Sequence, residues 1–364
     1  MAEWTRSMKN KAIQNLRKKI DSLDERLLQL LDERMEIVSR IGAEKIKTGE
    51  NVYHPEREKV IIERLSALKP TYLNHSAIEA IFLEIFAISR NLEMPERVAF
   101  LGPIGSYAHQ AAEERFGAMS EYLPVCNISS VFDAVVSKRA KYGVVPLENN
   151  INGIVGESVD CLILSDLKIF AEIILPIHHT FSSKEFTLRE IQRIYSKDIA
   201  FGQCKTFLHA HQLEEIEWVP VESTARAAQI VQKEKKSAAI CSKIAAKLYN
   251  IPTMFENIED SNKNKTRFIV VGDFTSRPSQ RDKTSIFAKL KDHNRVGALQ
   301  ELLEDFKAFG INLTKIDSRP VASDNFDFGF YIDFLGHRDD ENVKKFFQKQ
   351  GNNIKWLGSY VREI

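Results

Sequence analysis

The first part of the chain carries apolar side chains at helical spacing. They recur mostly at three- or four-residue steps over one stretch: Ile13, Leu16, Ile20, Leu23, Leu27, Leu30, Ile37 and Ile41. No proline or glycine occurs before Gly42, so the pattern predicts one helix of ~40 residues, roughly 60 Å long. Further helices are predicted from Pro55, which suits a first helical turn, and over residues 76–92. Because a small monomeric domain cannot cover so long a helix, a second chain is expected to complete the bundle.

Beyond residues 94–97 the apolar pattern changes to that of short strands. Strands are predicted at 98–102, 142–148, 167–177, 193–196, 238–241 and 267–272. Helices are predicted between them at 106–116, 129–140, 156–164, 204–213 and 223–234. This alternation predicts an α/β domain with a largely parallel sheet.

A linker is predicted at 273–283, followed by a third pattern. Its elements are strand 284–291, helix 296–309, strands 311–319 and 326–335, helix 340–350 and strand 353–362. The order βαββαβ is that of the α+β ferredoxin-like unit. The sequence therefore predicts a multidomain protein divided at 1–94, 97–273 and 284–364.

Composition excludes several classes of protein. The 364 residues include 51 basic and 50 acidic side chains, a balance that does not indicate a nucleic-acid surface. The four cysteines, Cys126, Cys161, Cys204 and Cys241, form no CxxC pair, which argues against a zinc site or a disulfide framework. No signal-peptide pattern and no membrane-spanning apolar run occurs. We expect a cytoplasmic protein without metal, membrane or nucleic-acid partners.

Polar residues interrupt the helical pattern at positions otherwise given to apolar ones. They are Arg34, Lys45, Glu58, Ser89 and Glu93. One interpretation is that helix ends fray and long side chains reach water. The other is a cation-rich pocket for an anionic ligand inside the bundle, because buried charge is costly unless it is paired. Such a pocket, with no cysteine, histidine or metal-spaced carboxylates, acts by positioning and electrostatics.

The segment LRKKIDSLDERLLQLLDERMEIVSRIGAEK, with VYHPEREK after it, resembles the all-helical chorismate mutase family. The resemblance implies an intertwined dimer and a pericyclic conversion of chorismate to prephenate. By motif match, Arg17 reaches across from the partner chain to one carboxylate and Arg34 binds the other, a role that suits the bidentate guanidinium. Lys45 and Glu93 are the implied catalytic residues and donate to the ether oxygen.

Further residues of this implied site show both matches and departures. Arg57 and Glu58 lie near the substrate hydroxyl, and Ser89 touches a carboxylate. His54 stands where a well-known member has aspartate, and no role is assigned to it. Glu93 stands where some members have glutamine. Since an ionised glutamate cannot donate a hydrogen bond, Glu93 must be protonated to act.

The stretch FLGPIGSYAHQ, residues 100–110, joins a predicted strand to a predicted helix. Its glycines are spaced GxxG rather than GxGxxG, no GK[ST] follows, and the next strand, YLPVCNI, ends without an acidic residue. Dinucleotide binding is therefore not expected. The alternatives are a bare structural turn and a helix N-terminus, capped by Ser106, that presents N–H groups to an anion.

Five segments favour the anion site. VAFLGPIGSYAHQAA, GVVPLENNINGIVGESVDCL, IYSKDIAFGQCKTFL, ESTARAA and NKNKTRFIVVG together resemble the prephenate dehydratase family over about residues 98–272. The family implies two α/β lobes similar to periplasmic-type binding proteins, with substrate in the cleft between them. Prephenate loses CO2 and water to give phenylpyruvate, and aromatisation drives the reaction, so no cofactor is expected.

The resemblance also implies the site residues of this part. Thr266, in the motif Thr266-Arg267-Phe268, is the implied catalytic residue and assists hydroxide departure. The implied prephenate-binding residues are Ser106, Asn149, Gln203, Glu148, Glu222 and Arg267, and either glutamate is a candidate proton donor. The alternative for Thr266 is an ordinary strand threonine, and the alternative for Arg267 is a structural ion pair. His179 also matches a family position, and its alternative is a structural role.

Two departures from this family are visible. Asn150 follows Glu148-Asn149, where the family commonly has serine or threonine, and Lys197-Asp198 stands where it commonly has His-Pro. Neither removes a residue of the implied site.

The C-terminal unit lacks a catalytic set of its own. RVGALQELLEDF and NLTKIDSRP resemble the ACT domain of prephenate dehydratases, which binds phenylalanine at a subunit interface. The implied effector contacts are Gly297, Ala298, Leu299, Asn312 and Ser318. The alternative is that GAL starts a helix and SRP ends a strand.

Taken together, the three segments resemble the bifunctional family of phenylalanine biosynthesis. The resemblance implies an enzyme that is active as a homodimer or higher homo-oligomer and is inhibited by phenylalanine. A fusion of the mutase with a prephenate dehydrogenase would need a GxGxxG motif, which is absent. A non-catalytic amino-acid sensor is the other alternative. The presence of Arg34, Lys45 and Thr266 argues against it.

Overall fold

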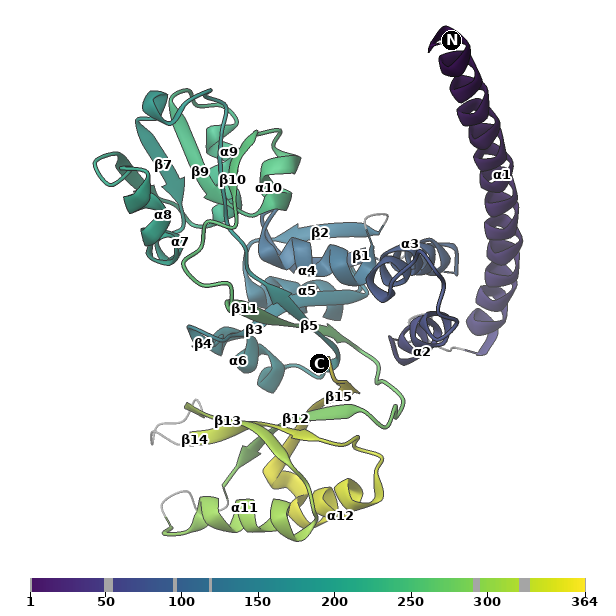
Figure 1. Ribbon diagram of the computed structural model, residues 1–364. Coiled ribbons are helices and arrows are strands. Elements are labelled where there is room, and N and C mark those ends of the chain that lie inside the picture. Colours follow the sequence, from purple (N-terminus) through teal and green to yellow (C-terminus); the bar gives the residue numbers. More distant parts are fainter. Residues whose placement is uncertain are drawn as a thin grey trace.

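The computed structural model describes residues 2–48, 55–93, 97–117, 120–290, 295–320 and 328–363, with side chains in these ranges except those of 2–12, 46–48 and 93. Three parts follow one another along the chain: a helical part, a two-lobed α/β part and a C-terminal α+β part (Figure 1). No helix in the described ranges has both the length and the apolar character needed to cross a bilayer.

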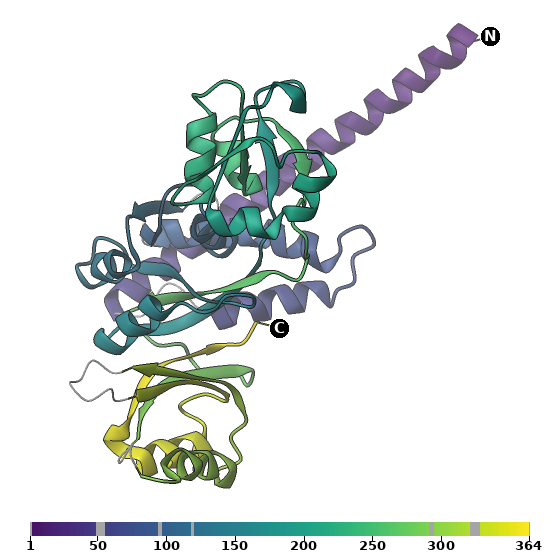
Figure 2. The same cartoon turned by 90° about the vertical axis from the view of Figure 1, so that its left-hand side faces the viewer.

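The helical part consists of α1 (Ala2–Thr48), α2 (Pro55–Ser66) and α3 (His75–Glu93). The predicted long helix is therefore present as a single element of 47 residues. Its N-terminal half projects away from the rest of the molecule (Figures 1 and 2). The eight apolar side chains of the predicted pattern remain 42–60% exposed on it.

The two-lobed part places most of its first lobe before residue 177. That lobe contains β1 (Arg97–Leu101), α4 (Tyr107–Phe116), β2 (Glu121–Val125), α5 (Ile128–Val136), β3 (Tyr142–Asn149), β4 (Gly153–Ile154), α6 (Gly156–Leu164), β5 (Lys168–Pro176) and the later β11 (Lys265–Gly272). The second lobe contains β6 (Thr180–Ser183), β7 (Arg193–Ser196), α7 (Asp198–Gln203), α8 (Lys205–Ala210), β8 (Glu217–Pro220), α9 (Thr224–Val231), β9 (Ser237–Cys241), α10 (Lys243–Leu248) and β10 (Thr253–Glu256).

The chain crosses between the lobes twice, through adjacent connections. The N–H of Ile177 donates to the Asn264 carbonyl at 2.9 Å, and that of Ile258 donates to the His179 carbonyl at 3.1 Å. Because the returning strand β11 enters from the second lobe, it runs antiparallel to both of its neighbours, β3 and β5. The expected largely parallel sheet is therefore a mixed sheet, and β6 and β10 add antiparallel strands to the second lobe.

The C-terminal part contains β12 (Asp282–Lys289), α11 (Ala298–Ala308), β13 (Leu313–Pro320), β14 (Phe328–Leu335), α12 (Glu341–Gln350) and β15 (Ile354–Val361). This is the βαββαβ order that the sequence predicts. Its strands do not form a separate sheet: the order β13-β14-β12-β15 continues directly into β5-β11-β3-β1-β2 of the first lobe. Gly358 permits this junction, because a Cβ there would lie 2.0 Å from the Ile169 carbonyl oxygen.

The apolar core fixes the ends of two central strands. Val144 and Val145 on β3 and Ile269 and Val270 on β11 are fully buried. Since these strands lie in the middle of the shared sheet, the core fixes the position of their polar ends, which face the second lobe.

Candidate functional site

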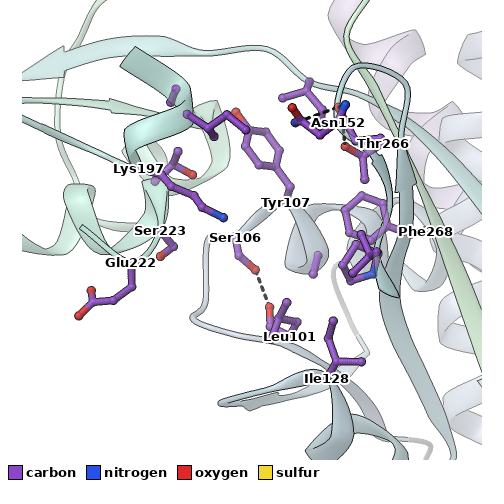
Figure 3. Close-up of a pocket in the computed structure, with 18 of the residues that line it drawn as sticks. Leu101, Ser106, Tyr107, Ile128, Asn152, Lys197, Glu222, Ser223, Thr266 and Phe268 are labelled. Atoms are coloured by element: carbon purple, nitrogen blue, oxygen red, sulfur yellow. Dashed lines mark hydrogen bonds between the residues drawn. The ribbon is translucent and has the colours of Figure 1, made fainter. Parts of the chain in front are cut away.

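A cavity of about 900 Å³ lies between the two lobes. Its lining comes from the ends of β1, β3 and β11 and the start of α4 in the first lobe, and from α7 and the start of α9 in the second (Figure 3). Of the predicted residues, Ser106, Asn149, Gln203, Glu222 and Thr266 all line it. The structure therefore brings together residues that are up to 160 positions apart, from Ser106 to Thr266, in the sequence.

Thr266 and Asn149 face each other in the register of β11 and β3. The Asn149 Nδ2 donates to Thr266 Oγ1 at 2.9 Å, to Asn264 Oδ1 at 2.7 Å and to the Lys265 carbonyl at 3.1 Å. Its Oδ1 accepts from the backbone N–H groups of residues 151 and 152. The amide is thus locked as a donor toward Thr266, whose oxygen accepts and whose own proton can be donated into the cavity.

Two helix N-termini face the cavity from opposite lobes. Ser106 caps α4 by accepting from the His109 N–H at 3.3 Å, and Ser223 caps α9 by accepting from the Arg226 N–H at 3.1 Å. Both caps line the cavity (Figure 3). Helix N-termini carry partial positive charge, so this pair suits a ligand with two anionic groups.

The loop before α4 holds the lobes close together. Gly105 has φ +88°, and a Cβ there would lie 3.2 Å from Ala245 Cα in the second lobe. Ser242 Oγ donates to the Gly105 carbonyl at 2.9 Å, and the Tyr249 hydroxyl donates to the Ile104 carbonyl at 2.7 Å. The predicted anion-binding loop is therefore also a contact between the lobes.

A buried row of polar groups orients Gln203. His179 is 2% exposed; its Nε2 lies 2.8 Å from Gln203 Oε1 and its Nδ1 lies 2.8 Å from the Tyr107 hydroxyl. Burial lowers the pKa of His179, so the ring is neutral at pH 7. His179 therefore positions Gln203. Tyr107 and Asn264 were not among the predicted site residues, although both lie within the motifs GPIGSYAHQ and NKNKTRF.

Glu148 and Arg267 lie outside the cavity, which corrects their prediction as substrate-binding residues. Arg267 is 5% exposed and bonds Glu148 at 3.0 Å, Asp333 at 2.6 Å and the Tyr360 hydroxyl at 2.6 Å; its Nε also lies 2.8 Å from Glu172. Successive strand residues point to opposite faces, so the neighbours of Asn149 and Thr266 point toward the C-terminal part. Arg267 therefore has a structural role in ion pairs, which is the alternative that the sequence left open for it.

Glu148 is also unsuited to donate a proton. Burial acts to raise its pKa, but hydrogen bonds and charge from Lys315 and Arg267 outweigh burial and hold the pKa below its ordinary value. The carboxylate is ionised at neutral pH. Glu222, the other candidate, lines the cavity but directs its carboxylate away from Thr266 (Figure 3).

The helical part brings two of its predicted residues together. Arg34 on α1 donates to Ser89 Oγ on α3 at 2.6 Å, and its guanidinium lies 5.9 Å from the centre of the Phe86 ring. Lys45 is half-buried three helical turns further along α1. Arg17 is exposed and about 25 Å from Arg34 along the helix axis, so within one chain it cannot reach the same ligand.

Other predicted residues of this part have a different placement. The Glu58 carboxylate pairs with Arg90, which also donates to the Phe116 carbonyl at 3.0 Å, so Glu58 sits at the junction with the first lobe. This differs from the predicted contact with a substrate hydroxyl, and Arg90 was not predicted. Arg57 is exposed. The Glu93 side chain and His54 lie outside the described residues.

The predicted effector residues lie at the outer end of the shared sheet. Gly297 has φ +85° and precedes α11, which begins with Ala298 and Leu299. Asn312 is exposed just before β13, the terminal strand of the sheet, and Ser318 is exposed within that strand. Gly297, Ala298 and Leu299 thus lie at one end of α11, whereas Asn312 and Ser318 belong to the segment that leads into and forms β13.

Comparisons with known proteins match two families along the chain. The family Prephenate dehydratase matches residues 98–275, and the family Chorismate mutase type II matches residues 16–94. A bifunctional chorismate mutase/prephenate dehydratase of Aquifex aeolicus is 38% identical over 359 residues, covering 97% of this chain and 98% of its own length.

Two solved structures share the fold over about three quarters of the chain. Prephenate dehydratase of Arthrobacter aurescens in complex with L-Phe is 29% identical, with a TM-score of 0.68, and covers 73% of this chain and 90% of its own. Prephenate dehydratase of Staphylococcus aureus is 26% identical, with a TM-score of 0.59, and covers 72% of this chain and 99% of its own.

Proposed function

Since the chain belongs to the family of bifunctional chorismate mutase/prephenate dehydratases, we propose that its two activities act in sequence in L-phenylalanine biosynthesis, under feedback inhibition by phenylalanine. The chain converts chorismate to prephenate and prephenate to phenylpyruvate. The main support for the location of the dehydratase site is the grouping of four residues around one cavity between the lobes: Thr266, Asn149, Ser106 and Gln203. The division into mutase residues 1–94, dehydratase residues 97–273 and sensor residues 284–364 is part of the proposal.

In the dehydratase step, the ring carboxylate leaves as CO2 and the ring hydroxyl leaves as hydroxide, which takes a proton from solvent to become water. The electron pair of the broken C–C bond enters the ring as the C–O bond breaks, and the ring becomes aromatic. The Thr266 hydroxyl donates a hydrogen bond to the departing oxygen, because Asn149 occupies its acceptor side. The capped starts of α4 and α9 stabilise the negative charge of the substrate from both lobes.

The test of this function is to supply chorismate to the full chain and follow prephenate and phenylpyruvate with time. Prephenate is expected to appear first and phenylpyruvate after it. Accumulation of prephenate alone would contradict the dehydratase assignment. Consumption of neither compound would favour the alternative of a non-catalytic sensor.

For the mutase step, we propose an active site completed by a second copy of the chain. Arg34 and Ser89 lie together, whereas Arg17 is about 25 Å away on the exposed half of α1. A partner helix packed on the apolar face of α1 would cover that face and bring its own Arg17 to this pocket. Lys45 and Glu93 are the proposed donors to the ether oxygen.

Replacing both Leu23 and Leu27 on this face with glutamate is expected to separate the subunits. Leu23 and Leu27 are 57% and 56% exposed in the single chain, and glutamate at both places would bury charge in the proposed interface. Light scattering of the unaltered protein is expected to give at least twice the mass of one chain. The doubly substituted protein is expected to give a smaller mass and to have lost mutase activity. Glu25→Gln, on the same helix, is the control. A monomeric unaltered chain would contradict the proposal.

The proposed sensor connects its effector strand to the dehydratase site. On β13, Lys315 pairs with Glu148, the neighbour of Asn149. Ser318 is followed by Arg319, which donates to both carboxylate oxygens of Asp160 on α6 at 2.9 and 3.0 Å. A ligand that shifts β13 therefore acts on β3, which carries Asn149, and through the Glu148–Arg267 pair on β11, which carries Thr266. The L-Phe complex of the Arthrobacter relative supports phenylalanine as this ligand.

Phenylalanine is expected to lower dehydratase activity and to raise the thermal midpoint of the full chain. A ligand that binds only the folded state stabilises it by about 2.7 kcal/mol at one hundred times its Kd. Calorimetry with and without phenylalanine, beside an activity assay on prephenate, measures both effects. Alanine, which lacks the ring, serves as the control amino acid. If phenylalanine changes neither quantity, the sensor assignment fails.

A further inference from the structure

Lys197 is a cation in the dehydratase cavity that the site assignment leaves without a role. Among the described residues that line the cavity, it is the only lysine or arginine. Figure 3 shows its side chain extending from the second lobe toward Ser106 on the first. Arg267, the cation expected to bind substrate, is instead enclosed between Glu148, Glu172 and Asp333.

The substrate requires such a charge. Prephenate carries two carboxylates, whereas the first-lobe groups around the cavity, Thr266, Asn149 and Ser106, are neutral hydrogen-bonding groups. Moving a carboxylate out of water is costly unless a cation or several donors meet it. The partial charges of two helix N-termini meet part of this cost.

The main chain holds Lys197 in a defined place. It follows β7 directly, and its carbonyl accepts from the Ala200 N–H at 2.9 Å in the first turn of α7. Gln203, at the end of the same helix, lines the cavity and lies against His179 at the crossing between the lobes. The flexible lysine side chain thus extends from a backbone position that is fixed by hydrogen bonding, close to the Gln203 amide.

Only one of the two carboxylates is a suitable partner. The ring carboxylate must give up its negative charge to leave as CO2, so a cation paired with it would stabilise the substrate more than the transition state. The pyruvyl carboxylate keeps its charge throughout and remains in the product. A lysine bound to it holds substrate without opposing the reaction.

We propose that Lys197 binds the pyruvyl carboxylate of prephenate across the cavity and is a specificity-determining residue of the dehydratase site. The inference rests on the dehydratase activity of this cavity. The ammonium group of lysine is a compact charge on a flexible stem, which suits a single carboxylate on the other side of the cavity.

The test compares Lys197→Met with Lys205→Met in the full chain. Lys205 is exposed at the start of α8, near in sequence but outside the cavity lining, so it is the matched control. Lys197→Met is expected to raise KM for prephenate about 10- to 100-fold, with kcat nearly unchanged. The inhibition constant of phenylpyruvate is expected to rise by a similar factor. Lys197→Arg should recover most of the affinity.

Each outcome distinguishes a different claim. Equal KM values in the two methionine variants would overturn the role of Lys197. A raised KM with an unchanged phenylpyruvate inhibition constant would overturn the choice of carboxylate. If the unaltered chain forms no phenylpyruvate, the dehydratase assignment fails, and the proposal for Lys197 fails with it. Mutase activity in the same samples reports whether each variant is folded.

Discussion

Thr266→Ala is expected to lower kcat of the dehydratase reaction by about 100-fold or more and to leave mutase activity unchanged. The hydroxyl that donates to the departing oxygen is lost, whereas the partners that hold Asn149 remain. Asn149 Nδ2 keeps Asn264 Oδ1 at 2.7 Å and the Lys265 carbonyl at 3.1 Å as acceptors. The structure of the cavity should therefore survive the change.

Steady-state assays with prephenate and with chorismate on one preparation measure this separation. Thr266→Ser, which keeps the hydroxyl and loses a methyl group, is the control and should retain most of the activity. Loss of both activities in Thr266→Ala would indicate unfolding. Full dehydratase activity in that variant would remove Thr266 from the mechanism.

Arg267→Met is expected to destabilise the junction between the first lobe and the C-terminal part by about 3–5 kcal/mol. Asp333 is 1% exposed and would lose the guanidinium 2.6 Å away, keeping only its hydroxyl partners such as Ser285. Glu172 would keep Lys283 at 2.7 Å. The uncompensated charge on Asp333 is therefore the main cost.

The effect of this substitution should depend on pH. Burial acts to raise the pKa of Asp333, but Arg267 and hydrogen bonds outweigh burial and lower the pKa below its ordinary 3.8 in the native protein. That contribution to stability is present above pH 3.8 and is lost as the pH falls through the lowered value. Without Arg267, burial raises the pKa of Asp333, so the difference in stability should be largest near neutral pH and shrink toward pH 4.

Thermal unfolding across this pH range measures the effect. Arg281→Met is the matched control, because Arg281 pairs with Glu63 at 2.9 Å with both side chains largely exposed, and such pairs contribute about 0–1 kcal/mol. Equal losses in the two variants would contradict the structural role assigned to Arg267. A difference that does not shrink in acid would point to lost packing rather than lost charge.

The apolar spacing of the long helix is a local signal, so the sequence pattern predicts that helix well, whereas the cavity residues follow from the resemblance to a known family. The apolar spacing that predicts α1 needs no knowledge of the partner, and motifs around Ser106, Asn149, Gln203 and Thr266 converge on one cavity. The short strands β6, β8 and β10 escape prediction, because segments such as TFSS and EWVP lack a clear apolar alternation.

The assignments of Glu148 and Arg267 fail for a reason that strand geometry explains. Each is adjacent to a residue that faces the cavity, so each faces the other side of the sheet. Alternation alone could have separated them. What covers that other side could not be predicted, because it depends on β15 pairing with β5, a contact between residues that are 190 positions apart at Val361 and Ala171.

The shared sheet has a consequence for any attempt to produce the dehydratase part without the C-terminal part. Cutting after residue 275 removes β15 and leaves β5, with Ile169, Phe170 and Ala171 buried in the whole chain, as a bare edge. An unpaired apolar edge invites pairing with other chains and aggregation. The proposed role of β13 is therefore better tested by point changes on that strand, which leave the sheet whole.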